Sequence, residues 1–202
     1  MITLPPFYPI VDSAEWVGRL APLGIELVQL RLKTQPAEVI RREVHAALAV
    51  CRWQGVQLVV NDHWQIALDE GADFIHLGQQ DLFDADLKAI RGRGMRLGIS
   101  THDHAELHRA LAASPDYVAL GPIYATTRKQ MPWAPQGLPR IAEWKRLIGD
   151  RPLVAIGGIT LERAAGCFDA GADSIATIGD VTGHADPLAR AAAWLTATAA
   201  HP

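Results

Sequence analysis

Three long polar side chains alternate with apolar residues in the segment VQLRLK. Gln29, Arg31 and Lys33 occupy every second position, so all three lie on one side of the pleat if the segment is a β-strand. Two cations on one face of an otherwise apolar strand need a negatively charged partner. One alternative is that Lys33 is a solvated loop lysine and that Arg31 pairs with a neighbouring carboxylate.

Two carboxylates follow the next two apolar runs of the chain. Asp62 lies beside Asn61 in VVNDH, and Asp81 ends the segment IHLGQQD. Neighbouring strands lie about 4.8 Å apart, so carboxylates at the ends of adjacent strands can converge on one cation. Mg²⁺ prefers one or two protein carboxylates together with waters and substrate phosphates. We therefore predict a Mg²⁺ site at Asp62 and Asp81 that faces a diphosphate; alternatively, each aspartate caps the helix after its strand.

Further groups suited to phosphate follow the later strands. The segment LGIST ends a strand at Thr101, and its Ser100 faces the same mouth with a hydroxyl that can donate to phosphate or water. Gly157 and Gly158 follow one late strand and Gly179 follows the next, and glycines there let backbone N–H groups approach a phosphate where barrels most often bind it. The alternative is that these glycines only turn the chain.

The segment 121–137 is the longest loop that the sequence predicts, and it is rich in Pro, Thr and Gln. Its polar residues that suit an anion are Thr126, Thr127, Arg128 and Lys129. Trp133 is an aromatic residue that could cover a flat heterocycle beside a pocket. The alternative to anion binding is that such a polar loop is simply solvated. Gly121 and Gly137 stand at its ends, so we expect the loop to act as a lid.

Three histidines occur close together in THDHAELH, and two of them are spaced for one helix face. His104 and His108 could share a zinc ion at this spacing, but no third ligand or catalytic Glu completes a known pattern. We therefore expect these two to face solvent, and we keep His102, nearest the strand end, as an acid or base candidate. Cys51 and Cys167 lie in apolar helical segments without an adjacent base, so we expect them to pack in the core.

Short apolar runs and longer amphipathic segments must position these side chains, and they alternate throughout the chain. The apolar runs are 7–11, 26–31, 57–60, 73–77, 96–99, 116–120, 152–156 and 174–178. Helix signals lie between them, such as Pro36 before a long amphipathic segment that Gly55 closes. Eight such units in one chain of 202 residues predict a single α/β domain over residues 1–202, a (β/α)8 barrel.

The composition limits the classes of partner. The net charge of −3 gives no reason to expect nucleic acid or a polybasic membrane anchor, and no apolar run approaches the length of a membrane span. Two cysteines without a CxxC pair argue against a disulfide framework, so we expect a cytoplasmic protein. The expected partners are small phosphorylated molecules, and the sequence also leaves room for a homo-oligomer.

In combination, these motifs resemble the thiamine-phosphate synthase family, which includes the related thiazole tautomerase. The resemblance is carried, in the family's order, by QLRLK, NDHWQIALDEGADFIHLGQQD, GISTH, GPIYATTRK and AIGGIT. It implies a (β/α)8 barrel that joins 4-amino-5-hydroxymethyl-2-methylpyrimidine diphosphate to a thiazole phosphate. The implied products are thiamine phosphate and pyrophosphate, and the implied cofactor is Mg²⁺.

The resemblance also assigns roles to individual residues. The pyrimidine diphosphate would contact Gln29, Arg31, Lys33, Asn61, Ser100 and Lys129. Of these, the resemblance implies a part in catalysis for Arg31, Lys33, Ser100 and Lys129. The thiazole phosphate would contact Thr126, Thr127, Arg128, Gly158, Ile178 and Gly179. Asp62 and Asp81 would be the Mg²⁺ ligands.

Three positions depart from the family's usual pattern, and all lie on the thiazole side. Arg128 stands where a Thr is common, and Gly179 followed by Asp180 stands where a Ser is common. Gly179 keeps its backbone N–H, whereas a carboxylate at Asp180 would repel a phosphate unless it points away.

Two other functions fit the same family. A thiazole tautomerase would isomerise a thiazole carboxylate phosphate with His102 as proton shuttle. It would need neither residues that bind a diphosphate nor a pair of metal-binding carboxylates. A non-catalytic barrel that binds thiamine intermediates would tolerate loss of the charged groups. The joint presence of the charged residues favours the synthase over both; these are Arg31, Lys33, Asp62, Asp81 and Lys129.

Overall fold

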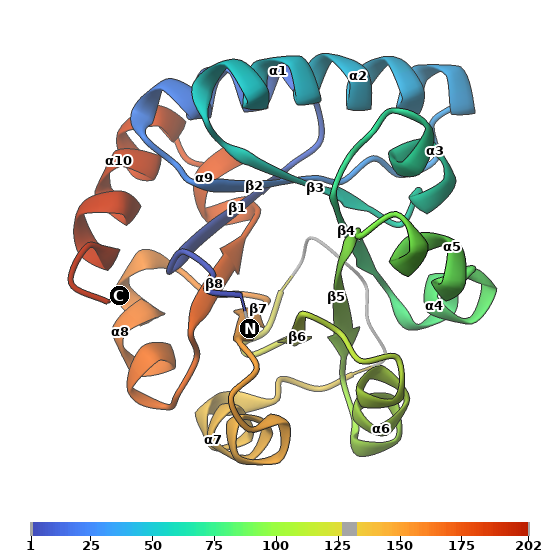
Figure 1. Ribbon diagram of the computed structural model, residues 1–202. Coiled ribbons are helices and arrows are strands. Elements are labelled where there is room, and N and C mark those ends of the chain that lie inside the picture. Colours follow the sequence, from blue (N-terminus) through green and yellow to red (C-terminus); the bar gives the residue numbers. More distant parts are fainter. Residues whose placement is uncertain (1, 127–132, 202) are drawn as a thin grey trace.

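A computed structural model describes residues 2–126 and 133–201, and within them eight parallel strands close into a barrel in chain order (Figure 1). The strands are β1 (Phe7–Val11), β2 (Leu27–Leu30), β3 (Gln57–Asn61), β4 (Phe74–Leu77), β5 (Arg96–Thr101), β6 (Tyr117–Leu120), β7 (Leu153–Ile156) and β8 (Ser174–Thr177). The barrel closes where β1 pairs with β8, with Phe7 beside Ile175. The predicted (β/α)8 barrel is confirmed.

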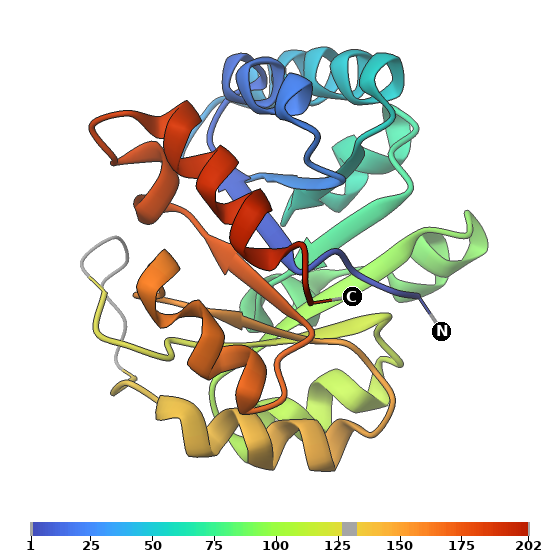
Figure 2. The ribbon, with the colours of Figure 1, turned by 90° about the vertical axis from the view of Figure 1, so that its left-hand side faces the viewer.

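Helices connect the strands and surround the barrel on the outside (Figures 1 and 2). They are α1 (Ala14–Leu20), α2 (Ala37–Gln54), α3 (Trp64–Asp69), α4 (Gln79–Asp84), α5 (Leu87–Gly92), α6 (His104–Ala112), α7 (Gly137–Ile148), α8 (Leu161–Asp169), α9 (Gly179–Thr182) and α10 (Pro187–Thr198). A short 3-10 turn, Ala21–Leu23, continues α1. Figure 2 shows both ends of the chain at the same end of the barrel.

Local signals in the sequence mark the ends of two helices, and Gly55 acts where it was expected. Gly55 adopts a left-handed conformation with φ of 70° and ends α2, as glycine does at helix ends because it has no Cβ to clash. Asp186 caps α10 by accepting from the backbone N–H of Ala189, and Pro187 occupies the first turn. Local sequence thus sets where these two helices end or begin.

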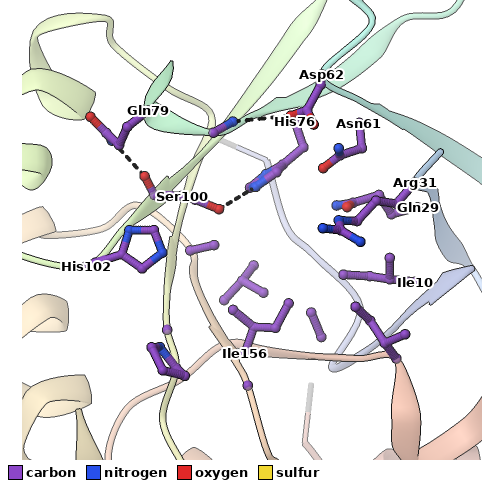
Figure 3. A pocket seen from close by; sticks show the side chains of 18 of the residues that line it. Ile10, Gln29, Arg31, Asn61, Asp62, His76, Gln79, Ser100, His102 and Ile156 are labelled. Carbon is purple, nitrogen blue, oxygen red and sulfur yellow. Dashed lines mark hydrogen bonds between the residues drawn. The ribbon is translucent and has the colours of Figure 1, made fainter. Parts of the chain in front are cut away.

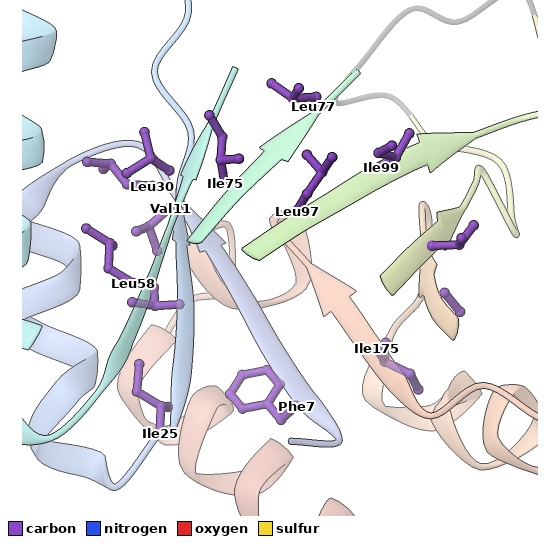
Figure 4. Packing of buried hydrophobic residues seen from close by; sticks show 14 of the residues in the cluster. Phe7, Val11, Ile25, Leu30, Leu58, Ile75, Leu77, Leu97, Ile99 and Ile175 are labelled. Carbon is purple, nitrogen blue, oxygen red and sulfur yellow. The ribbon is translucent and has the colours of Figure 1, made fainter. Parts of the chain in front are cut away.

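Apolar residues fill two layers, one between the barrel and the helices and one inside the barrel. Figure 4 shows part of the outer layer, which includes Leu30, Ile75 and Ile99 of the strands (Figure 4). The inner layer includes Leu27 of β2 and Phe74 of β4. Residues of one strand therefore alternate between the two layers, as the period of two requires.

The same alternation sets the direction of the polar residues. Leu27 and Gln29 of β2 face the barrel interior, and Arg31 follows with the same parity just past the end of the strand. β5 continues to Thr101, beyond the predicted run, so Ser100 lies inside a strand and faces the interior. The strand ends therefore direct these side chains into the mouth of the barrel.

The structure also bears on the expectations about membrane spans, metal clusters and the two cysteines. In the described ranges, no helix is both long and apolar enough to cross a membrane, and no group of three or more His, Cys, Asp or Glu side chains is placed to hold a metal ion. Cys51 and Cys167 are free and buried, and burial raises the pKa of each thiol to about 11. Both cysteines are therefore core residues, as the sequence predicted.

Candidate active site

A pocket of about 410 Å³ opens at the carboxyl ends of the strands. It brings together most of the residues that the sequence singled out, and Figure 3 shows several of them pointing into one space (Figure 3). Its lining includes Gln29, Arg31, Lys33, Asn61, Asp62, Asp81, Ser100, Thr126 and Ile178. Gly158 and Gly179 lie outside the lining, and Thr127, Arg128 and Lys129 fall outside the described residues.

The cations after β2 differ in their partners. The Lys33 ammonium forms an ion pair with Asp62, with 2.5 Å between Nζ and Oδ2. Within residues 2–126 and 133–201 the Arg31 guanidinium has no hydrogen-bond or ion-pair partner, although it lines the pocket. The alternative from the sequence is wrong for Arg31, which no neighbouring carboxylate of the described chain engages. Lys33 is an exposed loop lysine, as that alternative had it, but it is also paired with Asp62.

The two predicted metal ligands lie next to each other. Asp62 follows β3, Asp81 lies in the first turn of α4, and their carboxyl groups are within hydrogen-bonding reach. Burial tends to raise the pKa of Asp62, but the Lys33 ammonium offsets this and holds that pKa below its ordinary value. Burial, followed by the negative charge of Asp62, raises the pKa of Asp81. Two carboxylates in such contact repel unless a cation or proton lies between them.

Neither carboxylate caps a helix. The N-cap of α3 is His63 and that of α4 is Gly78, and in both helices no side chain makes a capping hydrogen bond. Asp62 itself has a backbone φ of 64°, a left-handed conformation that is uncommon outside glycine. Such strain persists where the surroundings hold it, often at functional sites. The structure therefore rules out the capping alternative for Asp62 and Asp81.

The donor set of this carboxylate pair fits Mg²⁺. The pair supplies two oxygen-bearing side chains, and Mg²⁺ takes its remaining ligands from water and phosphate. It does not fit a closed zinc site, which needs four nitrogen, sulfur or carboxylate ligands. The positive charge of Lys33 beside Asp62 also suits a site that receives a phosphate together with the metal.

A buried polar atom in the pocket lacks a partner. Asn61 is only 5% exposed, yet within the described chain its Nδ2 donates to no acceptor. A buried donor without an acceptor costs about 1–3 kcal/mol. Because Asn61 lines the pocket between β2 and β4, a bound ligand with an acceptor atom would satisfy it.

Residues that the sequence analysis missed line the floor of the pocket. Tyr8 of β1, His76 of β4 and Tyr117 of β6 are buried and hydrogen-bonded to one another and to predicted site residues. A signal for His76 was present, because it has the same parity as the inward-facing Phe74. A polar residue at an inward position of a barrel strand can be found by continuing the alternation.

A second polar group lies on the opposite wall of the pocket. His102 Nδ1 lies 2.6 Å from Oε2 of Glu106, and the same oxygen accepts from the His102 backbone N–H. The His102 ring stacks on Trp133, with ring centroids 5.6 Å apart. Trp133 thus lines the pocket as expected. His104 Nε2 lies 2.8 Å from Oε1 of Glu143, and the His104 side chain is half exposed.

The glycines after β7 are required by close packing. Gly157 and Gly158 have φ of 99° and 64°, conformations that residues with a Cβ rarely adopt. A Cβ on Gly157 would lie 2.6 Å from the Cα of Pro122, and one on Gly158 would lie 2.9 Å from the carbonyl carbon of Tyr124. The glycines therefore let the loop after β7 pack against the loop after β6.

Asp180 points away from the pocket, as the phosphate argument required. Its carboxylate accepts from Arg190 Nε at 2.9 Å and Nη2 at 3.0 Å, and from Trp194 Nε1 at 2.7 Å. Asp180 is absent from the pocket lining. The aspartate at this departing position therefore forms a structural ion pair with α10, and it adds no negative charge to the pocket.

Replacing Asp180 by alanine is expected to lower the free energy of unfolding by about 2 kcal/mol. The mutation would leave the indole N–H of the fully buried Trp194 without an acceptor and would remove one partner of Arg190. Urea unfolding of both proteins measures the difference. Asp169→Ala, on the exposed face of α8, is the control and should change stability by less than about 0.5 kcal/mol. Equal stability of the Asp180→Ala protein and the wild type would contradict the ion-pair assignment.

The closed barrel and its charged pocket define a (β/α)8-barrel protein of the enzyme type, whose active sites lie at the carboxyl ends of the strands. The family model for thiamine monophosphate synthase matches residues 7–181. The chain belongs to this family. The resemblance seen in the motifs is thereby confirmed.

Relatives with high identity support the same assignment. The chain is 59% identical to the thiamine-phosphate synthase of Rhizobium etli over 196 residues, which cover 97% of this chain and 96% of that protein. It is 45% identical to the thiamine-phosphate synthase of Neisseria meningitidis serogroup B, over 93% of this chain and 95% of that protein.

Solved structures share the fold. Thiamine phosphate pyrophosphorylase from Pyrococcus furiosus superposes with a TM-score of 0.84 at 23% identity, over 96% of each chain. 3-Hexulose-6-phosphate synthase from Salmonella typhimurium gives a TM-score of 0.71 at 14% identity, over 98% of this chain and 100% of that one. These likenesses concern the barrel alone.

Proposed function

We propose that the chain is a thiamine-phosphate synthase, which couples 4-amino-5-hydroxymethyl-2-methylpyrimidine diphosphate to a thiazole phosphate and releases pyrophosphate. The observation that carries the proposal is one rim of the pocket, where a carboxylate pair lies near an unengaged guanidinium and a buried unpaired amide. The identity to relatives named for this activity supports it.

The diphosphate of the pyrimidine substrate is assigned to the side of β2 and β3. The Arg31 guanidinium can form paired hydrogen bonds to phosphate oxygens, and Asn61 can donate its unpaired N–H. Lys33 would contact phosphate from its place beside Asp62, and Ser100 faces it from β5. Lys129, in the undescribed segment, stays a predicted contact.

Asp62 and Asp81 would hold Mg²⁺ in this enzyme. When bound, the ion would supply positive charge against the diphosphate leaving group. Two carboxylates leave several coordination positions for water and phosphate oxygens, which is how Mg²⁺ is commonly bound with phosphorylated substrates. Dependence on Mg²⁺ is thus part of the proposal.

The thiazole phosphate is assigned to the side of β7 and β8. Thr126 and Ile178 line the pocket there, and Gly179 begins α9, a short helix after β8. Loops after the seventh and eighth strands are the usual phosphate site of barrels. Gly158 packs against the loop after β6 and is absent from the pocket lining, so its contact stays a prediction. Thr127 and Arg128 stay predicted contacts outside the described residues.

The chain's own residues would mainly bind and position the substrates and stabilise the developing charge. Departure of pyrophosphate leaves a resonance-stabilised cation on the pyrimidine's exocyclic carbon, and the thiazole nitrogen then bonds to that carbon. Arg31 and Lys33 would stabilise the charge that develops on the leaving group. The wall of β7 and β8 would hold the thiazole in position for attack.

The two alternative functions, a thiazole tautomerase and a non-catalytic barrel that binds thiamine intermediates, explain fewer of the pocket residues than the synthase does. A tautomerase would use the His102–Glu106 pair but would have no need of Asp62, Asp81 or the unengaged Arg31. A barrel that only binds intermediates would need no carboxylate pair either. We also propose a cytoplasmic location, in keeping with the two free thiols; a homo-oligomer remains a prediction.

Incubation of the purified protein with both substrates, with and without Mg²⁺, tests the proposal. We expect thiamine phosphate and pyrophosphate in equal amounts, and loss of both when EDTA is present. Isomerisation of a thiazole carboxylate phosphate without coupling would show a tautomerase. Absence of any conversion would show a binding protein.

A further inference from the structure

A row of hydrogen bonds crosses the interior of the barrel and joins two predicted substrate contacts. Gln29 Nε2 donates to the Tyr8 hydroxyl at 2.9 Å, and the hydroxyls of Tyr8 and Tyr117 lie 3.1 Å apart. The Tyr117 hydroxyl lies 2.7 Å from His76 Nδ1, and His76 Nε2 lies 2.8 Å from Ser100 Oγ. Figure 3 shows the last of these bonds, with Ser100 facing the pocket (Figure 3).

The number of hydrogens that each group carries determines which group donates and which accepts in each hydrogen bond of the row. Tyr8 already accepts from the Gln29 amide, so its single hydrogen is left for Tyr117. Tyr117 then donates its own hydrogen to His76 Nδ1. A neutral imidazole that accepts at Nδ1 carries its hydrogen on Nε2, and it donates that hydrogen to Ser100 Oγ. The Ser100 hydrogen is consequently free for a ligand.

The opposite order leaves a buried hydrogen without an acceptor. If Tyr117 donated to Tyr8, the Tyr8 hydroxyl would accept twice, and its own hydrogen would find no partner in the described chain. Tyr8 is only 1% exposed, so an unpaired hydroxyl hydrogen there is costly. Only reversal of the Gln29 amide, with its oxygen facing Tyr8, would remove this cost.

The surroundings keep both phenols protonated and in place. Burial raises the pKa of Tyr8 and of Tyr117, so each hydroxyl retains its one hydrogen. The Tyr117 ring stacks on the His76 ring, with centroids 5.5 Å apart. A Cβ on Gly98 of β5 would lie 2.5 Å from the Tyr117 hydroxyl, so the glycine in this strand makes room for it.

We propose that Tyr117 and His76 are positioning residues that keep the Ser100 hydroxyl hydrogen directed at the diphosphate of the pyrimidine substrate. The proposal rests on the function proposed above, because the diphosphate is the acceptor that the hydrogen would meet. Ser100 is then a donor whose direction is fixed before substrate binds, which lowers the cost of orienting it during the reaction.

The tautomer of His76 gives a readout that does not depend on activity. In ¹⁵N-histidine-labelled protein without substrate, long-range ¹H–¹⁵N correlation is expected to show a neutral His76 ring with its hydrogen on Nε2. A hydrogen on Nδ1, or on both nitrogens, would overturn the proposal. Because substrate is absent, this result is separate from success or failure of the coupling assay.

A double-mutant cycle tests the consequence for catalysis. Ser100→Ala and Tyr117→Phe are each expected to lower kcat by about 10-fold or more, with the KM for the thiazole phosphate unchanged. The double mutant should be no slower than Ser100→Ala alone, because Tyr117 acts only through Ser100. Multiplication of the two losses would show a merely structural role for Tyr117 and would contradict the proposal.

Ser174→Ala is the matched control for loss of a buried hydroxyl. Ser174 is fully buried at the start of β8, and its Oγ has no hydrogen-bond partner in the described chain. We expect its kcat to equal that of the wild type. In labelled Tyr117→Phe protein the His76 ring should also populate the Nδ1 tautomer, and an unchanged spectrum would count against control by Tyr117.

Discussion

Asp81→Asn is expected to lower the rate of thiamine phosphate formation by about 10³-fold while the barrel stays folded. The change removes one of two carboxylates that lie within hydrogen-bonding reach of each other, and an amide is a poor ligand for Mg²⁺. The repulsion from Asp62 disappears at the same time, so stability should not fall. Steady-state rates at saturating Mg²⁺ and both substrates measure the effect.

Asp84→Asn is the matched control, because Asp84 is exposed at the end of the same helix, α4. Its rate should equal that of the wild type. Titration with Mn²⁺, followed by electron paramagnetic resonance in the presence of pyrophosphate, adds a direct measure of metal binding. Wild-type turnover by the Asp81→Asn protein, or equal Mn²⁺ affinity of the two variants, would refute the metal assignment.

Arg31→Ala is expected to lower kcat/KM for the pyrimidine diphosphate by about 10²- to 10³-fold. The guanidinium has no partner in the described chain, so its removal breaks no structural interaction, and the loss would reflect contact with the diphosphate. Arg31→Lys should recover only part of the activity, because an ammonium keeps the charge but lacks the planar fork. Steady-state kinetics with each substrate varied in turn give both values.

Arg41→Ala controls for the loss of one positive charge. Arg41 lies on the exposed face of α2 and pairs with Asp69 and Glu70, far from any assigned substrate contact. Its kinetics should match those of the wild type. Should Arg31→Ala retain wild-type affinity and rate for the diphosphate, the assignment of β2 as the diphosphate strand would be wrong.

Periodicity explains why much of the fold and of the site could be predicted from the sequence. The eight apolar runs became eight strands because each has residues for the outer apolar layer, and all but β5 also have residues for the inner one. The inward direction of Gln29 and Arg31 followed from the same alternation of side chains. A strand cannot change this alternation without turning its apolar residues outward. The carboxyl ends of parallel strands then place Asp62 and Asp81 at one rim.

Pairings between distant side chains could not be predicted in the same way. The row from Tyr8 through Tyr117 to His76 depends on strands that meet only when the barrel closes. The ion pair of Lys33 with Asp62 and the turn of Asp180 toward Arg190 likewise depend on the relative placement of separate elements. A single sequence contains the residue types but not the distances between them.

Crystals of the protein grown with Mn²⁺ and the pyrimidine diphosphate give the most direct test of the account. Anomalous scattering should place one Mn²⁺ between the carboxylates of Asp62 and Asp81, with the guanidinium of Arg31 bonded to phosphate oxygens. A metal bound elsewhere, or an Arg31 side chain turned away from the diphosphate, would contradict it.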